Sequence, residues 1–364
     1  MDDIRIPAGR MPSPDEKELI EERLLAPGKK RLWIYIAIAY GVAAVMTLFM
    51  AIGKGRDVDL TAFVNVQMMY PACGVILGKL IAKKDGEKLP LGLYITTLIT
   101  TGVMMLLALM SIIIPMEPLD MAGTPMDIWN LLSQMVLVLA AVVGYVFTWT
   151  CSKESRRLNG LSRNNIKWSV ILVVVFTILT VARIIIPYLI VGNGLQPLIE
   201  ALSEPMVLMT LLVLPINFFM TWIAFFGEEY GWRYYLQPVM QHKFGNRIGV
   251  LLLGVVWAVW HIGADFMYYT TTDGPQMFVE QIIACVAFAI FFGYAYMKTN
   301  NIWVPVIMHY INNNLGVLFN GGTAQDQHVA WSDLPLLLVA LLPMIIFILM
   351  PVFNKKSDRA VQNL

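Results

Sequence analysis

Residues 205–225 read PMVLMTLLVLPINFFMTWIAF, a continuous stretch without a charged side chain. As a helix rising about 1.5 Å per residue, a stretch of this length spans the roughly 30 Å hydrocarbon core of a bilayer. Its apolar residues are continuous rather than alternating, which favours a helix over a strand of a membrane barrel. The stretch runs into FGEEYGWRYYL, residues 226–236, where Glu228 and Glu229 stand side by side. It therefore predicts a membrane helix with two adjacent acids at its end.

The whole chain has the composition of a membrane protein. Of its 364 residues, 58% are hydrophobic and 14% are charged, with a mean hydropathy of +0.66. A soluble protein carries about 25% charged residues. We therefore predict an all-α, polytopic transmembrane helical bundle of about ten spans. The predicted spans lie near residues 33–53, 61–82, 91–115, 128–151, 168–191, 206–227, 248–266, 277–297, 302–319 and 334–353.

Lysine and arginine alternate between successive loops. The connections 83–90, 152–167, 229–247 and the tail 354–364 are basic, whereas 116–127, 192–205, 267–276 and 320–333 contain neither residue type. Lys54 and Arg56, in the first outer loop, are a minor exception. By the positive-inside rule, this pattern predicts a multi-pass protein of the cell membrane with both termini in the cytoplasm.

Polar side chains within apolar spans are costly and are candidates for function. His261 and His309 fall inside predicted spans, in WAVWHIGADF and VPVIMHYINNNLG, downstream of the Glu228–Glu229 pair. We expect these side chains to converge on one cavity that opens toward the cytoplasmic side.

Three further charged residues lie in or near spans. Arg183 lies well inside the fifth predicted span, and we expect it to pair with Glu228 or Glu229, or with backbone carbonyls at Pro187. Asp265 and Glu280 lie near the outer ends of their spans, where we expect them to be solvated.

The spacing of the polar residues places several of them in pairs on one helix face. Three pairs stand four positions apart and so share a helix face: Glu229 with Arg233, Trp257 with His261, and His309 with Asn313. Glu228 lies about 100° around its helix from Glu229, so the two acids need different surroundings. Three helices would thus each present a polar pair.

These residue types suit hydrolysis of a peptide bond by activated water. A carboxylate in a partly dry cleft can take a proton from water, and an imidazole beside it can share that water or protonate a leaving amine. A second histidine with an asparagine can donate hydrogen bonds to a developing oxyanion. No serine or cysteine stands convincingly beside either histidine, which disfavours an acyl-enzyme route.

A metal route stays open beside this one. Glu228, His261 and His309 are acceptable ligands for a divalent metal such as Zn²⁺, with a position left for water. The HExxH spacing of a zincin is absent, and the candidate ligands come from three separate helices. The cofactor is therefore either absent or a divalent metal.

The three motifs resemble those of the CAAX-protease and bacteriocin-processing (CPBP, or Abi) family of intramembrane peptidases. The family pattern is EExxxR, then an aromatic residue separated by three positions from a His, then HxxxN or HxxxD. It falls here on Glu228-Glu229-xxx-Arg233, Trp257-xxx-His261 and His309-xxx-Asn313. Many members carry Phe in place of Trp257, a departure that we expect to affect packing and substrate access more than chemistry. The sequence GWR after the Glu pair is similar to the prokaryotic branch of the type II CAAX prenyl endopeptidases.

The resemblance implies a role for each motif residue. Glu228 would be the general base that activates water, with His261 as its partner, and His309 and Asn313 would form the oxyanion hole. Glu229 and Arg233 would form a supporting ion pair that holds Glu228 in place. The family is described both as metallopeptidases and as glutamate peptidases, so the resemblance leaves metal dependence open.

On this basis we divide the chain into four parts. Residues 1–31 are a cytoplasmic polar leader, 32–205 hold the N-terminal transmembrane helices, 206–320 form a catalytic CPBP-like core, and 321–364 hold the last span and a cytoplasmic tail. The implied function is that of an intramembrane endopeptidase, in a prokaryotic plasma membrane. Its partners would be membrane-embedded or membrane-anchored peptide or protein substrates and the lipid bilayer, without nucleic acid.

Two other interpretations use the same residues. The Glu pair could mark the point where the sixth span meets water, with Arg233 as a surface partner. Alternatively, the chain could be a transporter or a non-catalytic peptide-binding chaperone whose polar cluster binds a proton, an ion or a peptide. The donor pair of His309 and Asn313 opposite a glutamate separates these interpretations, because hydrolysis needs it and simple binding does not.

Overall fold

The computed structural model describes residues 28–121, 124–192, 194–319 and 323–354. The predicted leader, except for residues 28–31, and the tail beyond residue 354 lie outside the described residues. The described part is almost entirely helical, which confirms the all-α class. A hairpin of β1 (Leu119–Met121) and β2 (Thr124–Met126) is antiparallel, with Leu119 opposite Met126.

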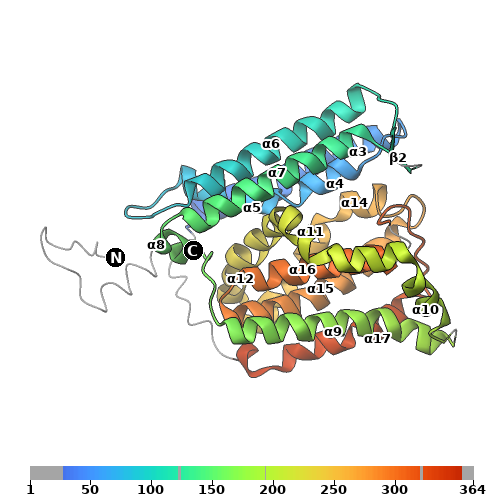
Figure 1. The fold of residues 1–364 in the computed structure, drawn as a ribbon. Helices are drawn as coiled ribbons and strands as arrows, with labels where there is room; N and C mark the ends of the chain where they lie inside the picture. Colours follow the sequence, from blue (N-terminus) through green and yellow to red (C-terminus); the bar gives the residue numbers. More distant parts are fainter. Residues whose placement is uncertain (1–27, 122–123, 193, 320–322, 355–364) are drawn as a thin grey trace, which may run out of the picture.

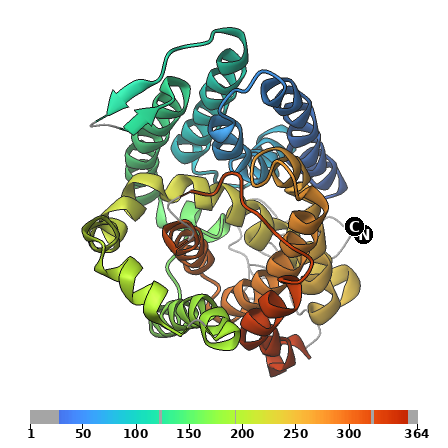
Figure 2. The ribbon, with the colours of Figure 1, turned by 90° about the vertical axis from the view of Figure 1, so that its right-hand side faces the viewer.

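The helices form two groups, which Figure 1 shows as layers one above the other. The first group consists of α2 (Lys29–Ile36), the π-helix η1 (Ala37–Val42), α3 (Ala43–Lys54), α4 (Thr61–Gln67), α5 (Tyr70–Ile81), α6 (Leu91–Ile113) and α7 (Ile128–Thr150). After α8 (Lys153–Leu158), the second group consists of α9 (Ile166–Val191), α10 (Gln196–Ser203), α11 (Pro205–Glu229), the π-helix η2 (Tyr230–Leu236), α12 (Gln237–Phe244), α13 (Asn246–Trp260), α14 (Ile262–Met267), α15 (Gly274–Thr299), α16 (Trp303–Phe319), α17 (Leu334–Ile345) and the 3₁₀ turns η3 (Ile346–Leu349) and η4 (Pro351–Phe353). In the second group, α16 packs against α9, α11 and α15 (Figure 2).

Six helices in the described chain are long and apolar enough to cross a membrane, or seven if the bent pair α4–α5 forms one span. Two shorter apolar helices, Asn246–Trp260 and Leu334–Leu349, fall below that length. The total of ten spans and the cytoplasmic position of the termini therefore stay predictions.

The helix that carries the Glu pair does not end there. α11, η2 and α12 continue one another, and the apolar helix runs over Val207–Phe244. Glu228 and Glu229 thus lie within a long helix, at the point where its hydrogen bonding changes to the π type. The helix therefore continues past residue 227, near which the predicted sixth span ends, and Trp232, Tyr235 and Leu236 in the continuation are also buried.

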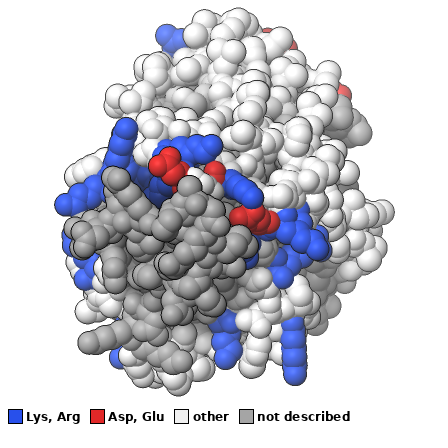
Figure 3. All heavy atoms as spheres, turned by 90° about the vertical axis from the view of Figure 1, so that its left-hand side faces the viewer, with Lys and Arg blue, Asp and Glu red and all other residues white. Residues whose placement is uncertain are grey.

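The loops gather at two ends of the bundle. At one end, hydrogen bonds join Lys88 to Asn159, Asn164 to Asn300, and Arg247 to Asn354. Lysine and arginine side chains gather there (Figure 3), and we call this end the basic face.

At the opposite end, other loops meet. Gln325 donates hydrogen bonds to Asp59 and Thr61, and the backbone of Gln327 bonds to that of Tyr269. We call this end the acidic face, because its loops carry, beside Lys54 and Arg56, the acids Asp57, Asp59, Glu117, Asp120, Asp127, Asp273, Asp326 and Asp333. The alternation of charge seen in the sequence is thus an alternation between two faces of the fold.

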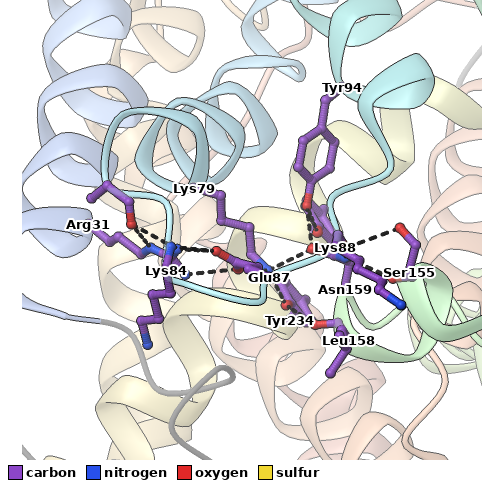
Figure 4. Close-up of polar contacts among 12 residues, drawn as sticks. Arg31, Lys79, Lys84, Glu87, Lys88, Tyr94, Ser155, Leu158, Asn159 and Tyr234 are labelled. Carbon is purple, nitrogen blue, oxygen red and sulfur yellow. Dashed lines mark hydrogen bonds and ion pairs between the residues drawn. The ribbon is translucent and has the colours of Figure 1, made fainter. Parts of the chain in front are cut away.

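A buried ion cluster ties the loop after α5 to the first helix (Figure 4). Glu87 accepts hydrogen bonds from Arg31 and Lys79, and all three side chains are at most 5% exposed. Burial alone would raise the pKa of the Glu87 carboxyl, but the hydrogen bond from Arg31 and the positive charge of Lys79 hold that pKa below its usual value. Glu87 is therefore the counter-charge of two buried cations.

Replacing Glu87 with glutamine should destabilise the fold strongly. Two buried cations would then lack a counter-charge, and breaking such a cluster costs about 3–5 kcal/mol. The measurement is a thermal melting curve in detergent. As a matched control, Glu154→Gln removes a carboxylate that pairs with Lys88 on the surface, where side chains are about half exposed and pairs contribute at most about 1 kcal/mol. Equal melting temperatures for the two variants would contradict the assignment.

Candidate active site

Two glycines bring the helix with the Glu pair against the break between α4 and α5. A Cβ on Gly227 would lie 2.5 Å from the carbonyl oxygen of Met68, and a Cβ on Gly231 would lie 2.2 Å from the Cβ of Pro71. No side chain larger than hydrogen fits at either position without a shift of the backbone. The glycines on both sides of the Glu pair therefore fix its depth and its distance from the first group of helices.

Glu229 joins η2 to α16. Its carboxylate is fully buried and accepts a hydrogen bond from Nε of Arg233 at 2.8 Å, while its other oxygen lies 2.9 Å from Nδ1 of His309. The Arg233 guanidinium lies over the rings of Trp257 and Phe292, at 4.7 and 5.3 Å from their centroids. Because Arg233 is 0% exposed, the interpretation of this pair as a surface contact is wrong.

The charges of this cluster balance with one further proton. Glu228 and Glu229 carry two negative charges when ionised, and Arg233 supplies one positive charge. A protonated His309 makes the set neutral, which a buried cluster favours because unbalanced charge is costly away from water. In that state Nδ1 donates to Glu229, and Nε2 is a second donor on the opposite side of the ring.

Glu228 is held on one side and open on the other. Its Oε2 accepts hydrogen bonds from the indole nitrogens of Trp257 at 2.8 Å and Trp232 at 3.2 Å. No described side chain or backbone group donates to Oε1, and Glu228 lines a cavity. This arrangement fixes the carboxylate and leaves one oxygen for a ligand or a water molecule.

Trp257 thus contributes a hydrogen bond to Glu228 in addition to the effects on packing and substrate access that we expected of it. A phenylalanine could fill the same space but could not donate a hydrogen bond to Glu228. Trp257 also places its backbone carbonyl 2.9 Å from Nδ1 of His261, so it contacts two of the predicted site residues.

Trp257→Phe should lower kcat by about tenfold or more while the protein stays folded. A hydrogen bond to a charged group contributes about 1.5–3 kcal/mol, and its loss leaves Glu228 held by one indole. Trp222→Phe is the matched control, since it also removes a buried indole donor, here to the carbonyl of Ala141, away from the cavity. Equal kcat values for the two variants would show that the Trp257 hydrogen bond does not contribute to catalysis.

His261 stands at the break between α13 and α14. A carbonyl can only accept, so the contact with Trp257 requires a proton on Nδ1 of His261. The neutral imidazole then presents the lone pair of Nε2. His261 also lines the cavity, so this nitrogen is suited to accept a proton there.

Asn313 lies one turn beyond His309 on α16 and accepts a hydrogen bond at Oδ1 from Asn312 at 3.0 Å. Asn312 in turn accepts one from Nη2 of Arg183, also at 3.0 Å. Arg183 thus pairs with an asparagine, and the expected pairing with Glu228 or Glu229 is wrong: Glu229 pairs with Arg233 and His309, and Glu228 accepts from two indoles.

The four predicted catalytic residues meet on one cavity. Glu228, His261, His309 and Asn313 all line a space of about 890 Å³. The cavity continues toward the acidic face, where its lining includes Asp59, Thr61, Pro125, Asp127, Tyr268, Tyr269, Thr323, Ala324, Gln325 and Gln327. Buried side chains of η2 and its neighbours fill the end toward the basic face, so the cavity does not open there. Whether it opens toward the cytoplasm, as expected, depends on the orientation in the membrane, which stays a prediction.

Asp265 differs from its predicted position. It is 0% exposed, and neither carboxylate oxygen has a hydrogen-bond partner, so the expectation that it is solvated is wrong. α14 lies between α3 and α15, and a Cβ on Gly263 would lie 2.4 Å from Oγ1 of Thr47. This close packing buries Asp265, whereas Glu280 lines the cavity.

In the described part of the chain, no three His, Cys, Asp or Glu side chains are grouped so that they could hold a metal ion. A zinc site takes three or four ligands at about 2.0–2.3 Å. Glu228, His261 and His309 share the cavity but do not form such a group, and Nδ1 of His309 faces Glu229 instead. These residues, as placed, do not fit a metal centre.

Comparison with known families gives one match. Residues 207–315 match the model of the family described as type II CAAX prenyl endopeptidase Rce1-like. This segment is similar to that family, and we call it the Rce1-like domain. Comparisons with curated proteins and with solved structures gave no significant match.

The Rce1-like domain contains the whole predicted motif set. It begins within α11 and ends within α16, so it includes Glu228, His261, His309 and Asn313. The resemblance inferred from three short motifs is thereby confirmed. The match indicates a peptidase that acts on membrane-associated protein substrates, and the apolar helices agree with a multi-pass membrane protein.

Helices outside the Rce1-like domain complete the cavity. Asp59, Asn65, Asp127, Asn130 and Arg183 line it from loops and helices that precede residue 207. The first group of helices and α9 therefore form part of the site wall.

Sequence reasoning missed Trp232 and Asn312, which contact the predicted residues. The sequence could have indicated Trp232, because this residue stands four positions after Glu228. Asn312 stands three positions after His309 and adjoins Asn313 in the run INNN, residues 311–314, so one face of α16 was rich in amides.

Proposed function

We propose that this protein is an intramembrane endopeptidase that hydrolyses peptide bonds of membrane-associated polypeptides with water activated by Glu228. One observation carries the proposal: the Glu228 carboxylate is fixed by two indole donors on one oxygen, its other oxygen has no donor among the described residues, and Glu228 lines a cavity together with two histidines and Asn313. A group held in this way is oriented for proton transfer without being buried out of reach.

Each residue of the candidate active site has a separate role in the proposed hydrolysis. Glu228 takes a proton from water, assisted by the lone pair of His261 Nε2, while the water oxygen bonds to the carbonyl carbon. Negative charge then develops on the carbonyl oxygen, and Nε2 of protonated His309 and the amide of Asn313 donate to it. When the C–N bond breaks, Glu228 or His261 returns the proton to the leaving amine. Atoms and charge balance with one water consumed.

Glu229 and Arg233 act as support in this scheme. Arg233 neutralises Glu229, and Glu229 orients His309 through Nδ1, so that Nε2 points away from the pair. The two adjacent acids thus have separate tasks, one in proton transfer and one in orienting a histidine.

The test is cleavage of membrane-anchored peptides by the purified protein in detergent, with and without a chelator. We expect cleavage that a chelator does not abolish, because the side chains do not form a metal-binding group. Loss of cleavage on chelation, restored by Zn²⁺, would refute the metal-independent mechanism. Binding of peptides without any product would instead favour a transporter or a peptide-binding chaperone.

A further inference from the structure

The candidate active site has a mouth at one end. Residues of four loops at the acidic face line it, among them Asp59, Pro125, Tyr268 and Ala324, and Pro125 is exposed. None of the lining residues comes from the described loops of the basic face, at 82–90, 151–165, 244–247 and 299–302. Figure 2 views the molecule from the acidic end.

Toward the basic face, polar and aromatic contacts close the site. The hydroxyl groups of Tyr94 and Tyr230 lie 2.7 Å apart, and the rings of Tyr230 and Tyr234 stack at 4.6 Å. Lys79 donates to the Tyr234 hydroxyl at 2.9 Å, which connects this stack to the buried ion cluster (Figure 4). Phe226 continues the stack toward Trp303. Substrate entry from this side would have to break the cluster.

We propose that the active site is loaded from the extracytoplasmic side of the membrane, by an anchored polypeptide whose cleavage segment enters between the loops of the acidic face. The basic face lies in the cytoplasm by the positive-inside rule, so the mouth opens on the other side. This inference rests on the proposed function for the identity of the ligand, but not for the side of entry.

The charges near the mouth also select the substrate. Asp59, Asp127 and Glu280 line the cavity, whereas Arg183 is its one Lys or Arg among the described residues. A cleft lined mainly by charges of one sign raises the local concentration of ligands that carry the opposite charge. Neutral or basic cleavage segments should therefore be cleaved faster than acidic ones of the same length.

A single cysteine at the mouth tests the side of entry. In a background with Cys73, Cys151 and Cys285 replaced by alanine, Ala324→Cys places a thiol on the lining at the acidic face, and Lys153→Cys places one on the basic face. A membrane-impermeant thiol reagent is added to intact cells and, separately, to inverted membrane vesicles. We expect Ala324→Cys to react in cells and Lys153→Cys to react in vesicles.

Each outcome decides a separate point. Reaction of Ala324→Cys in inverted vesicles alone would overturn the proposed side of entry, whether or not any peptide is cleaved. If the thiol reacts from outside but a bulky adduct leaves cleavage unchanged, the substrate does not pass this mouth and the proposal fails. If no peptide is cleaved by the unmodified protein, the proposed function fails, while the labelling still reports which side the cavity faces.

A second inference comes from the chain of amides on α16. Arg183 has donors but no acceptor, so Asn312 must turn Oδ1 toward it. The Nδ2 group of Asn312 then faces Asn313 and fixes Oδ1 of Asn313 as an acceptor. The remaining part of the Asn313 side chain is its NH₂ group, which is the donor that an oxyanion needs.

We infer that Arg183 is a positioning residue for Asn313. A neutral side chain with both donors and acceptors could not enforce this direction, because either amide could flip. Among the described residues no acid lies within 4.0 Å of Arg183: Glu280 interacts with it electrostatically from a greater distance, and the guanidinium lies 5.4 Å from the centroid of the Phe288 ring. Its Nε has no hydrogen-bond partner, so the bond from Nη2 to Asn312 is the directional contact that the structure gives it.

Arg183→Met and Arg183→Lys test this role. Methionine fills the space without a donor and removes a cation from membrane depth, so the fold should persist. We expect kcat to fall about 10–100-fold, less than the roughly 10²–10³-fold effect of removing an oxyanion donor outright. Lysine, which also only donates, should retain more activity than Arg183→Gln.

The deciding measurement is a double-mutant cycle with Asn313→Ala. If Arg183 acts through Asn313, Arg183→Met should cost no further kcat in the Asn313→Ala background. An additive loss, or a rise in KM that depends on a carboxylate in the peptide, would show that Arg183 binds substrate directly and would overturn the inference.

Discussion

Glu228→Gln is expected to reduce cleavage by about 10²–10⁴-fold, the contribution of a positioned general base. The amide oxygen of glutamine can still accept hydrogen bonds from Trp232 and Trp257, so the side chain should keep its place. What it loses is the ability to take a proton from water. The measurement is kcat for an anchored peptide, beside a melting curve in detergent.

The control for this variant is Glu154→Gln, which removes an acid from the basic face far from the cavity. It should keep normal kcat and normal melting. Near-normal cleavage by Glu228→Gln would refute the proposed mechanism, whereas unfolding of Glu228→Gln would contradict the hydrogen-bonding argument.

Arg233→Ala should abolish activity and lower stability together. Its removal leaves Glu229 fully buried with His309 as its remaining partner, and breaking a buried ion pair costs about 3–5 kcal/mol. The ring faces of Trp257 and Phe292 also lose the guanidinium between them. The melting temperature in detergent and kcat should both fall.

Arg247→Ala separates this effect from the loss of any arginine. Arg247 donates to Asn354 at the surface, where such contacts contribute at most about 1 kcal/mol. If Arg233→Ala melts like the wild type but is inactive, Arg233 would act on the substrate rather than on Glu229. If Arg233→Ala is both stable and active, the ion pair has no supporting role.

The helical membrane class and the Glu229–Arg233 pair were accessible from sequence because both depend on short-range periodicity. An i,i+4 spacing brings side chains together on any helix, whatever surrounds it. The motifs also predicted which residues gather near the Glu pair, and the structure places Glu228, His261, His309 and Asn313 on one cavity. Their catalytic roles remain proposals.

Other features depend on tertiary packing and could not be predicted in this way. The side on which the cavity opens depends on Tyr94 of α6 meeting Tyr230 of η2, 136 positions apart. The burial of Asp265 follows from the break at His261 and from the contact of Gly263 with Thr47. No local pattern distinguishes these arrangements from their alternatives.

The contacts of Gly227 in α11 and Gly231 in η2 determine which length of chain can evolve or be transplanted as a unit. Gly227 and Gly231 have no side chain because Met68 and Pro71 occupy that space, so the surface they present is complementary to one partner. Residues 207–315 in isolation would expose this flat strip of backbone to lipid, with nothing to fill the missing volume. Recombination that exchanges the first group of helices must therefore preserve the backbone path from Met68 to Pro71, or change both glycines at the same time.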